Sequence, residues 1–292
     1  MKIIKDNYIY AFDSAHESIA HVDLNEVFMV ETLDCYGGNL KTEKDLRSDF
    51  PDLQTNGSTG PIYINNVKKG DTIALDILQI DLDEQGVMVT RPNGGLLGNE
   101  ITGYETKLLP IKKDHAILAN KIHVPLNKMI GVIGVAPKKG SISCVEPGFH
   151  GGNLDTKDIT VGNTLYLPIF HDGGLLALGD LHAAMGDGEL NGSGIEIGGR
   201  VLLRVRKVNE VDTITPIVET EDRIKIIYSD QDFYTAVREC MKYVITLLME
   251  RHKISFNDAY RLLSISGDIK VSQLVNPKVT IRISLPKKVL NF

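Results

Sequence analysis

Short apolar runs separated by Gly, Asn, Asp and Pro make up the chain from residue 1 to residue 228. The runs are EVFMVET (26–32), GPIYINNV (60–67), DTIALDILQI (71–80), GVMVT (86–90), MIGVIGVA (129–136), TLYLPIF (164–170), RVLLRVRKV (200–208) and RIKIIYS (223–229). Runs of this length between turn-forming residues are typical of β-strands. We therefore expect a mainly β fold over residues 1–228, a β-sandwich or barrel assembly almost free of long helices.

The pattern changes after residue 228, where apolar residues recur at close to a 3.6-residue spacing. Residues 229–252 carry this spacing behind a serine and an aspartate three residues apart, which predicts a capped amphipathic helix. A second helix is predicted over 256–266, and the alternation in KVTIRISLP (278–286) predicts a strand. We expect residues 229–292 to form a small α+β element, helix-helix-strand, packed on the β body.

Composition narrows the possible partners. The chain has 292 residues, 42% of them hydrophobic, and a formal net charge of -6. Without a dense Lys/Arg block it lacks an electrostatic footprint for nucleic acid or an anionic membrane, and a small neutral or cationic partner fits better. No apolar run approaches the roughly 20 residues that span a bilayer, so we expect no transmembrane helix and no signal peptide.

The cysteines indicate a reducing compartment. Cys35, Cys144 and Cys240 are odd in number, far apart and without a C-x-x-C pair. This pattern favours neither a disulfide framework nor a cysteine zinc site. The cytoplasm is the compartment that it predicts.

The segment GDLHAAMGDGELNG (179–192) gathers acidic residues and a histidine among glycines. Asp180 and His182 lie two residues apart near the end of a predicted strand, so their side chains should share one face of the sheet. Together they could hold a divalent ion with a bound water. The alternative is a plain Asp-His hydrogen bond at a sheet edge.

Three further acids follow in the same region: Asp187, Glu189 and Glu196. Glu196 stands between Ile195 and Ile197. If it is buried there, its pKa should rise toward the range of a general acid or base. Simple alternation instead places the two isoleucines in the core and Glu196 in water.

A second glycine-rich segment, EPGFHGGNLDTKD (146–158), offers both backbone and side-chain polar groups. The N–H groups of Gly151 and Gly152 could stabilise a developing oxyanion. His150, Asn153 and Asp155 add polar side chains beside them. A glycine-rich β loop without a ligand is the alternative.

A third segment, ETLDCYGGNL (31–40), ends an apolar strand with acids. Glu31 and Asp34 can supply oxygen ligands, although aspartates also occur in turns for local hydrogen-bonding reasons. Cys35 suggests a nucleophile, but no activating base for it can be identified in the sequence. The chain lacks G-x-S-x-G, the phosphate-binding G-x-x-x-x-G-K-[ST] and H-E-x-x-H, which disfavours serine hydrolases, nucleotide enzymes and zincins.

Taken together, these segments resemble the acetamidase/formamidase family. The resemblance rests on GDLHAAMGDGELNGSGIE (179–196), PGFHGGNLD (147–155) followed by GNTLYLPIF, GVIGVAP (131–137), TGPIYINNVKKGD (59–71) after ETLDCYGGN, and the tail SFNDAYRLLSISGDIKVSQLVNP. These motifs run in the family's order and cover most of the chain.

The resemblance implies hydrolysis of short amides such as acetamide or formamide to a carboxylate and ammonia. It also implies a homo-oligomer, a divalent metal in some members, and cyclic amides (γ-lactams) as substrates of some similar proteins. Met185 departs from the glutamine expected in many members. That difference leaves the identity of the amide open.

The resemblance also suggests roles for individual residues. Metal ligands are expected at Asp180 and His182 with Glu31 or Asp34, and the metal is expected to be zinc, or calcium if oxygen ligands dominate. Glu196 or Asp187 would move a proton to the leaving ammonia. The loop of His150, Gly151, Gly152 and Asn153 would contact the substrate or its oxyanion.

Two other functions fit the same residues. One is a non-catalytic β-sandwich module in which the acidic loops hold a structural calcium, a site that has little use for His182. The other is an amidase without metal that acts through a carboxylate or cysteine nucleophile. Such an enzyme would survive chelation and form a covalent acyl-enzyme.

Overall fold

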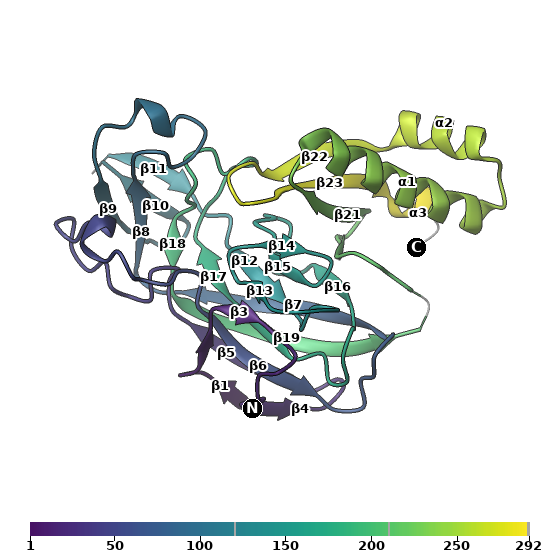
Figure 1. Cartoon of the computed structure of the whole chain (residues 1–292), viewed down its shortest axis with the longest axis horizontal. Helices are drawn as coiled ribbons and strands as arrows, with labels where there is room; N and C mark the ends of the chain where they lie inside the picture. The colour runs from purple at the N-terminus through teal and green to yellow at the C-terminus, as the bar shows by residue number, and fades with distance from the viewer. Residues whose placement is uncertain (120, 210, 291–292) are drawn as a thin grey trace.

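The computed structural model describes residues 1–119, 121–209 and 211–290. Two large sheets pack against each other around one main hydrophobic core, and helices lie at one end of the molecule (Figure 1). The strand order of each large sheet is an open path within these ranges. The prediction of a mainly β fold is therefore confirmed, in its sandwich form.

The first large sheet has nine strands. In spatial order they are β1 (Lys2–Ile4), β5 (Val27–Thr32), β19 (Gly199–Val208), β7 (Thr72–Leu82), β16 (Thr164–Pro168), β20 (Ile217–Glu219), β21 (Arg223–Asp230), β23 (Val279–Pro286) and β22 (Asp268–Gln273). All neighbours pair antiparallel except β1 with β5.

The second large sheet has ten strands. Its main path is β14 (Pro147–Gly148), β15 (Gly151–Asn153), β12 (Met129–Gly134), β17 (Leu176–His182), β18 (Glu196–Ile197), β8 (Gln85–Thr90) and β9 (Glu105–Pro110), with β6 (Ser58–Ile64) on β17 and with β2 (Tyr8–Ile9) and β4 (Ala20–Val22) on β6. Two small ladders complete the β structure: β3 (Ala11–Phe12) with β13 (Ile142–Ser143), and β10 (His115–Leu118) with β11 (Ile122–Pro125).

Strand β19 shows why these sequences form a sandwich. Val201, Leu203 and Val205 are fully buried in the main core, while Arg200 and Arg204 alternate with them on the exposed face. Side chains two residues apart share one face of a strand, so this pattern buries one side of the sheet and leaves the other in water.

The exposed face of the same sheet is held by a group of charges around Asp76 of β7. Asp76 accepts hydrogen bonds from Arg204 Nε (2.9 Å), Arg206 Nε and Nη2 (2.8 Å each) and Thr164 Oγ1 (2.8 Å). Burial alone would raise the pKa of Asp76, but the arginines and the hydroxyl outweigh it and lower the pKa to about 2.

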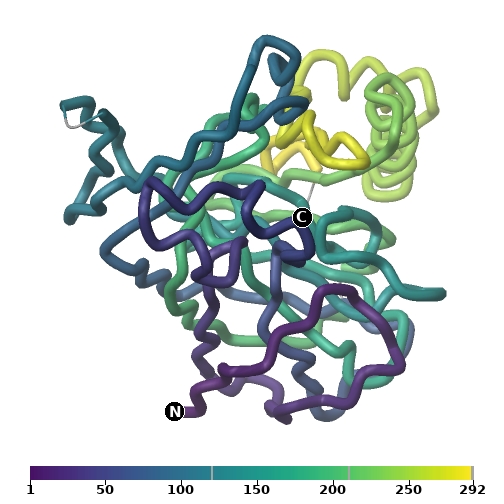
Figure 2. The backbone as a smooth tube through the Cα atoms, turned by 60° about the vertical axis from the view of Figure 1, so that its left-hand side comes forward, coloured from purple at the N-terminus to yellow at the C-terminus, as the bar shows by residue number. Residues whose placement is uncertain are grey.

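The helices begin and end close to where the sequence predicts. Helix α1 (Phe233–His252) is capped by Asp232, whose side chain accepts from the N–H of Thr235 (2.7 Å), and α2 (Phe256–Ser266) is capped by Ser255. Both cover the end of the nine-stranded sheet formed by β21, β23 and β22, over a second hydrophobic cluster (Figures 1 and 2). None of the described helices is both long and apolar enough to cross a bilayer.

The C-terminal region contains one strand more than the sequence predicts. Strand β22, with exposed Ile269 and Lys270 beside buried Ser272 and Gln273, lacks a clear alternation of apolar residues. It forms a hairpin with β23, and a short helix, α3 (Lys287–Leu290), follows. Two 3-10 turns, η1 (Arg47–Asp49) and η2 (Gly98–Glu100), lie in loops.

We expect Asp76→Asn to lower the free energy of unfolding at pH 7 by about 2 kcal/mol, between the values of exposed and buried ion pairs. Because the folded pKa is depressed, this stabilisation exists above the ordinary pKa of 3.8 and is lost as the pH falls toward about 2. Urea unfolding of the parent protein and of Asp76→Asn between pH 2 and pH 7 measures this difference in the free energy of unfolding. Asp81→Asn, an exposed change on the same strand, is the control. A difference in the free energy of unfolding that does not change with pH would contradict the stabilising role of the ionised Asp76.

Candidate functional site

Strand β17 carries Asp180 and His182, which the sequence predicts on one face. Leu176, Leu178 and Leu181 of this strand all belong to the main core, which strict two-residue alternation cannot produce. Asp180 has a left-handed backbone, with φ 54°, and the alternation shifts by one residue there. Leu181 therefore returns to the core, and Asp180 and His182 face away from it.

Gly131 of β12 stands beside Asp180 and makes room for two carboxylates. A Cβ atom at Gly131 would lie 2.7 Å from Asp155 Oδ1 and 2.9 Å from Asp180 Oδ2, closer than real contacts allow. Its carbonyl oxygen accepts from the N–H groups of Leu154 (3.1 Å) and Asp155 (3.2 Å). The missing side chain lets acids from two different segments approach each other.

Three of the acids in this region have an unfavourable backbone conformation. Asp155, Asp180 and Glu189 have φ values of 40°, 54° and 48°, in a region that residues other than glycine seldom occupy. All three are buried, with exposed fractions of 1%, 3% and 7%. Strain of this kind concentrates at functional sites, where the surrounding structure holds it.

Strand β18 places Glu196 directly opposite His182. Glu196 Oε2 lies 3.1 Å from His182 Nε2, and Asp180 Oδ1 lies 3.7 Å from the same nitrogen. Glu196 is buried together with Ile195 and Ile197, because β18 lies between β17 and β8. The alternation that would leave Glu196 in water is therefore wrong.

Neutral donors fix one oxygen of each of three carboxylates. Asn56 Nδ2 donates to Asp180 Oδ2 (2.7 Å), Asn276 Nδ2 donates to Asp155 Oδ2 (2.6 Å), and Ser193 Oγ and the Gly194 N–H donate to Glu196 Oε1 (3.0 Å each). Other buried atoms have no hydrogen-bond partner among the described residues: both ring nitrogens of His182, Glu189 Oε2 and Glu196 Oε2, although His182 Nε2 and Glu196 Oε2 face each other at ion-pair distance. Buried polar atoms left in this way mark a place for a ligand.

The buried groups shift one another's pKa. Burial raises the pKa of Asp155 to about 6, and burial with neighbouring carboxylates raises those of Asp180 and Glu189 well above their usual range. Burial would also raise the pKa of Glu196, but His182 outweighs it and lowers that pKa to about 2. The upward shift predicted for Glu196 is wrong because of this neighbour. In turn Glu196 outweighs the effect of burial on His182, whose pKa is raised well above its usual value.

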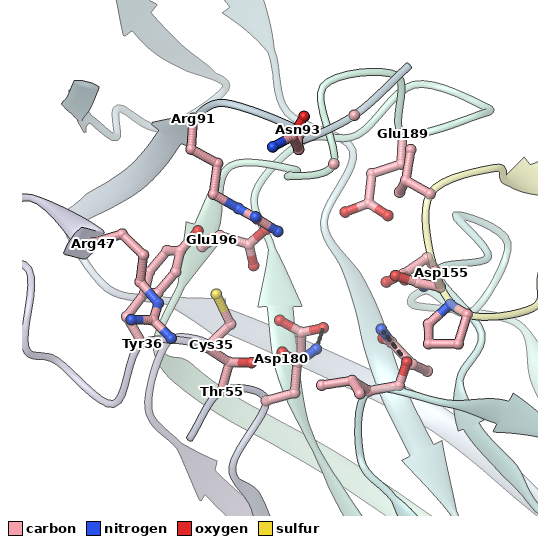
Figure 3. A pocket seen from close by; sticks show the side chains of 18 of the residues that line it. Cys35, Tyr36, Arg47, Thr55, Arg91, Asn93, Asp155, Asp180, Glu189 and Glu196 are labelled. Atoms are coloured by element: carbon pink, nitrogen blue, oxygen red, sulfur yellow. Dashed lines mark hydrogen bonds between the residues drawn. The ribbon is translucent and has the colours of Figure 1, made fainter. Parts of the chain in front are cut away.

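Asp155, Asp180, Glu189 and Glu196 line a cavity of about 740 Å³. Figure 3 shows Asp155 and Glu189 on one side of it, Asp180 and Glu196 near the middle, and Cys35 beside them. Two sets of donor atoms each lie within 4.8 Å of one another: Cys35, Asp180 and Glu196, and Asp155, His182 and Glu189. Carboxylates with an imidazole or a thiol are a donor set that can hold a divalent metal.

The structure leaves the other two predicted metal ligands outside both sets. Glu31 is partly exposed and accepts from Arg200 Nε at 2.8 Å. Asp34 Oδ1 accepts from the N–H groups of Tyr36 (2.8 Å) and Gly38 (3.2 Å), the local turn role that aspartates often have.

The predicted proton and substrate groups are divided between two places. Asn153 lines the 740 Å³ cavity, but His150 lines a second cavity of about 570 Å³, with its ring against Phe12. Gly151 and Gly152 pair with β12 and have positive φ; a Cβ at either would collide with backbone oxygens. They allow close packing of strands here.

Asp187 belongs to an ion-pair group beside the site. Its Oδ1 lies 2.6 Å from Arg282 Nη2 and its Oδ2 lies 3.2 Å from Lys157 Nζ. Arg282, on β23, is only 1% exposed and also reaches Asp158 at 2.6 Å. The loop that carries Glu189 is further joined to the hairpin by the Gly188 N–H, which donates to the carbonyl oxygen of Ser272 at 2.9 Å.

Several residues that line the cavity have no role that the sequence predicts. Asp155 and Glu189 lie within the quoted motifs, and their sequence signal was a carboxylate beside glycines. Asn56, Arg91 and Asn276 have no comparable signal, because loops distant in sequence bring them to the cavity. Met185 is buried, and it is not among the described residues that line the cavity.

Fold and site together define a β-sandwich protein with a cavity walled by buried acids, beside which one buried histidine lies. The chain belongs to the acetamidase/formamidase family, whose sequence model matches residues 10–143 and 139–292.

Solved and curated relatives agree with this membership. An acetamidase structure from Bacillus halodurans superposes with a TM-score of 0.96 at 39% identity, over 99% of this chain and 98% of that one. A formamidase of Methylophilus methylotrophus is 26% identical over 66% of this chain and 62% of its own length, so the chain spans about three-fifths of that relative. A γ-lactamase from Delftia acidovorans shares the fold, with a TM-score of 0.68 at 20% identity over 98% of this chain and 90% of that one.

We expect Gly194→Ala to destabilise the site, because its Cβ would lie 2.6 Å from His182 Nδ1 and 2.7 Å from Cγ. Overpacking of this kind lowers the free energy of unfolding by about 1–3 kcal/mol. Gly186→Ala in the same segment is the control, since its Cβ would meet nothing within 4 Å. Urea unfolding of both variants measures the difference; equal stabilities would contradict this account of the packing around His182.

Proposed function

We propose that this protein hydrolyses the C–N bond of amides to a carboxylate and ammonia. The observation that carries the proposal is the buried cluster of Asp155, Asp180, His182, Glu189 and Glu196. Its four acids line a cavity, and several of its atoms have no hydrogen-bond partner among the described residues. Family membership and relatives named acetamidase and formamidase support the reaction class.

We propose that a divalent metal, zinc first, is held by Asp155, His182 and Glu189. His182 Nδ1 and Glu189 Oε2 support this choice, since these buried atoms lack hydrogen-bond partners within the described ranges. A histidine with carboxylates is a common zinc set. When bound, such an ion supplies a Lewis acid for the amide carbonyl and lowers the pKa of water. A structural calcium alone would leave the role of His182 unexplained.

Glu196 is the group that we propose to carry a proton from the attacking water to the leaving nitrogen. Ser193 and Gly194 hold Oε1, so Oε2 remains available beside His182. Asp187, the other candidate, is engaged by Arg282 and Lys157. Asp180, fixed by Asn56, adds a second carboxylate beside the reacting group.

Cys35 supports a weaker alternative, a thiol nucleophile. Its sulfur lies within 4.8 Å of carboxylate oxygens of Asp180 and Glu196. Burial and these two carboxylates, Glu196 first, raise the pKa of the thiol well above its usual value. The thiol is therefore neutral at pH 7 and a poor nucleophile.

We also propose that the protein is cytoplasmic and forms a homo-oligomer. The thiols of Cys35, Cys144 and Cys240 are free and buried, which fits a reducing cytoplasm. A homo-oligomer remains a proposal from family membership.

Metal removal tests the reaction. We expect purified protein to release ammonia from acetamide or formamide, to lose this activity on exhaustive chelation and to regain it with zinc. Ring opening of 2-pyrrolidinone, followed as the appearance of an amine, tests the lactam alternative. Full activity without metal, together with an acyl adduct on Cys35 by mass spectrometry, would replace this mechanism with the nucleophilic one.

Glu196→Gln tests the proton carrier. We expect kcat to fall by at least about 100-fold, the usual contribution of general acid–base catalysis, while bound zinc and the unfolding transition are retained. Glu250→Gln, an exposed change on α1, is the control. A kcat within a few-fold of the parent protein would remove Glu196 from the mechanism.

A further inference from the structure

The cavity is much larger than acetamide requires. Its volume of about 740 Å³ falls in the range of roughly 300–1,000 Å³ that encloses ligands of many more atoms. Acetamide and formamide have only a few non-hydrogen atoms, and they would leave most of this space to water. The wall beyond the acids therefore has room for the rest of a longer acyl chain.

Arg47 gives that wall a fixed positive charge. Its Nη1 donates to the carbonyl oxygen of Phe50, and its Nη2 donates to that of Leu53 at 2.9 Å. These bonds orient the guanidinium and leave several of its five donors for another acceptor. No carboxylate pairs with Arg47 in residues 1–119, 121–209 and 211–290.

Arg91 adds a second guanidinium. It lines the same cavity, and its side chain has no hydrogen bond or ion pair to any other residue in the described part of the chain. By contrast, six arginines elsewhere form ion pairs: Arg200, Arg204, Arg206, Arg223, Arg261 and Arg282. Among the described residues, two arginines without an ion pair thus lie on the wall of one cavity, whereas most arginines elsewhere have a carboxylate partner.

The two signs of charge occupy different sides of the cavity. In Figure 3, Arg47 and Arg91 extend from one side, and Asp155 and Glu189 lie on the other. A ligand with an anionic group at one end would be attracted by the arginines and repelled by the acids. Its other end would then lie at the acids.

We propose that the substrate is a primary amide whose acyl chain ends in a carboxylate, and that Arg47 and Arg91 bind this carboxylate. This inference rests on the proposed amide hydrolysis. Water adds to the amide carbon, the C–N bond breaks, and the products are a dicarboxylate and ammonia. Guanidinium groups suit carboxylates because two parallel N–H donors match two oxygens.

A comparison of succinamate with butyramide tests the proposal. The two amides have the same number of carbon atoms, and only succinamate ends in a carboxylate. We expect kcat/KM for succinamate to exceed that for butyramide by about tenfold or more, the effect of hydrogen bonds to a charged group. Arg91→Gln should remove most of this preference and leave kcat/KM for butyramide within about twofold of the parent. Arg91 is exposed, so this variant should fold.

Two controls separate charge binding from other effects. Arg238→Gln, an exposed change on α1 away from the cavity, should leave the preference unchanged. Added NaCl should raise KM for succinamate more than KM for butyramide, because exposed charges are screened by salt. Equal kcat/KM values for the two amides, or a preference that survives Arg91→Gln together with Arg47→Gln, would overturn the proposal.

Failure of the proposed reaction gives a different result. If no amide is hydrolysed, with or without zinc, amide hydrolysis fails and the arginines are tested by binding alone. Calorimetric titration of succinate and of butyrate into the parent protein and into Arg91→Gln then tests whether Arg91 binds a carboxylate. Tighter binding of succinate that depends on Arg91 supports the carboxylate site, and equal binding overturns it.

Discussion

The burial of four carboxylates beside one imidazole is the constraint on which the site depends. Carboxylates taken out of water repel one another and require compensating partners. The chain supplies them in three ways: His182 lies between Asp180 and Glu196, asparagines and a serine donate to single oxygens, and glycines at 131 and 194 keep the space for close approach. Buried atoms that have no hydrogen-bond partner among the described residues remain, and these could hold a cation.

The same constraint explains the irregular strand at the centre of the molecule. A regular β17 could not bury Leu178 and Leu181 in one core and also present Asp180 and His182 to the opposite side. The left-handed conformation of Asp180 resolves this conflict at one residue, at an energetic cost that the flanking ladders with β12 and β18 outweigh.

The fold could be predicted from sequence because its signals are local. Strand runs such as 200–208 and the caps of both helices depend on neighbouring residues alone. In the site, Asp180 and His182 were predicted from their spacing, whereas Asn276 and Arg91 reach the cavity through tertiary packing that no local pattern encodes. Glu31 shows the opposite case. Its position at a strand end predicted a metal ligand, but its carboxylate pairs with Arg200 of the neighbouring strand. The pKa of Glu196 likewise depends on a neighbour from another strand.

The hairpin of β22 and β23 has a consequence for the order in which the protein is made. Its turn supplies Asn276 to Asp155, its strand supplies Ser272 to the loop of Glu189, and Arg282 joins that loop to the sheet. All three residues are translated after every acid of the cluster. On the ribosome the acids therefore emerge before the groups that hold them, so a finished site, and with it any chemistry, must await the end of synthesis.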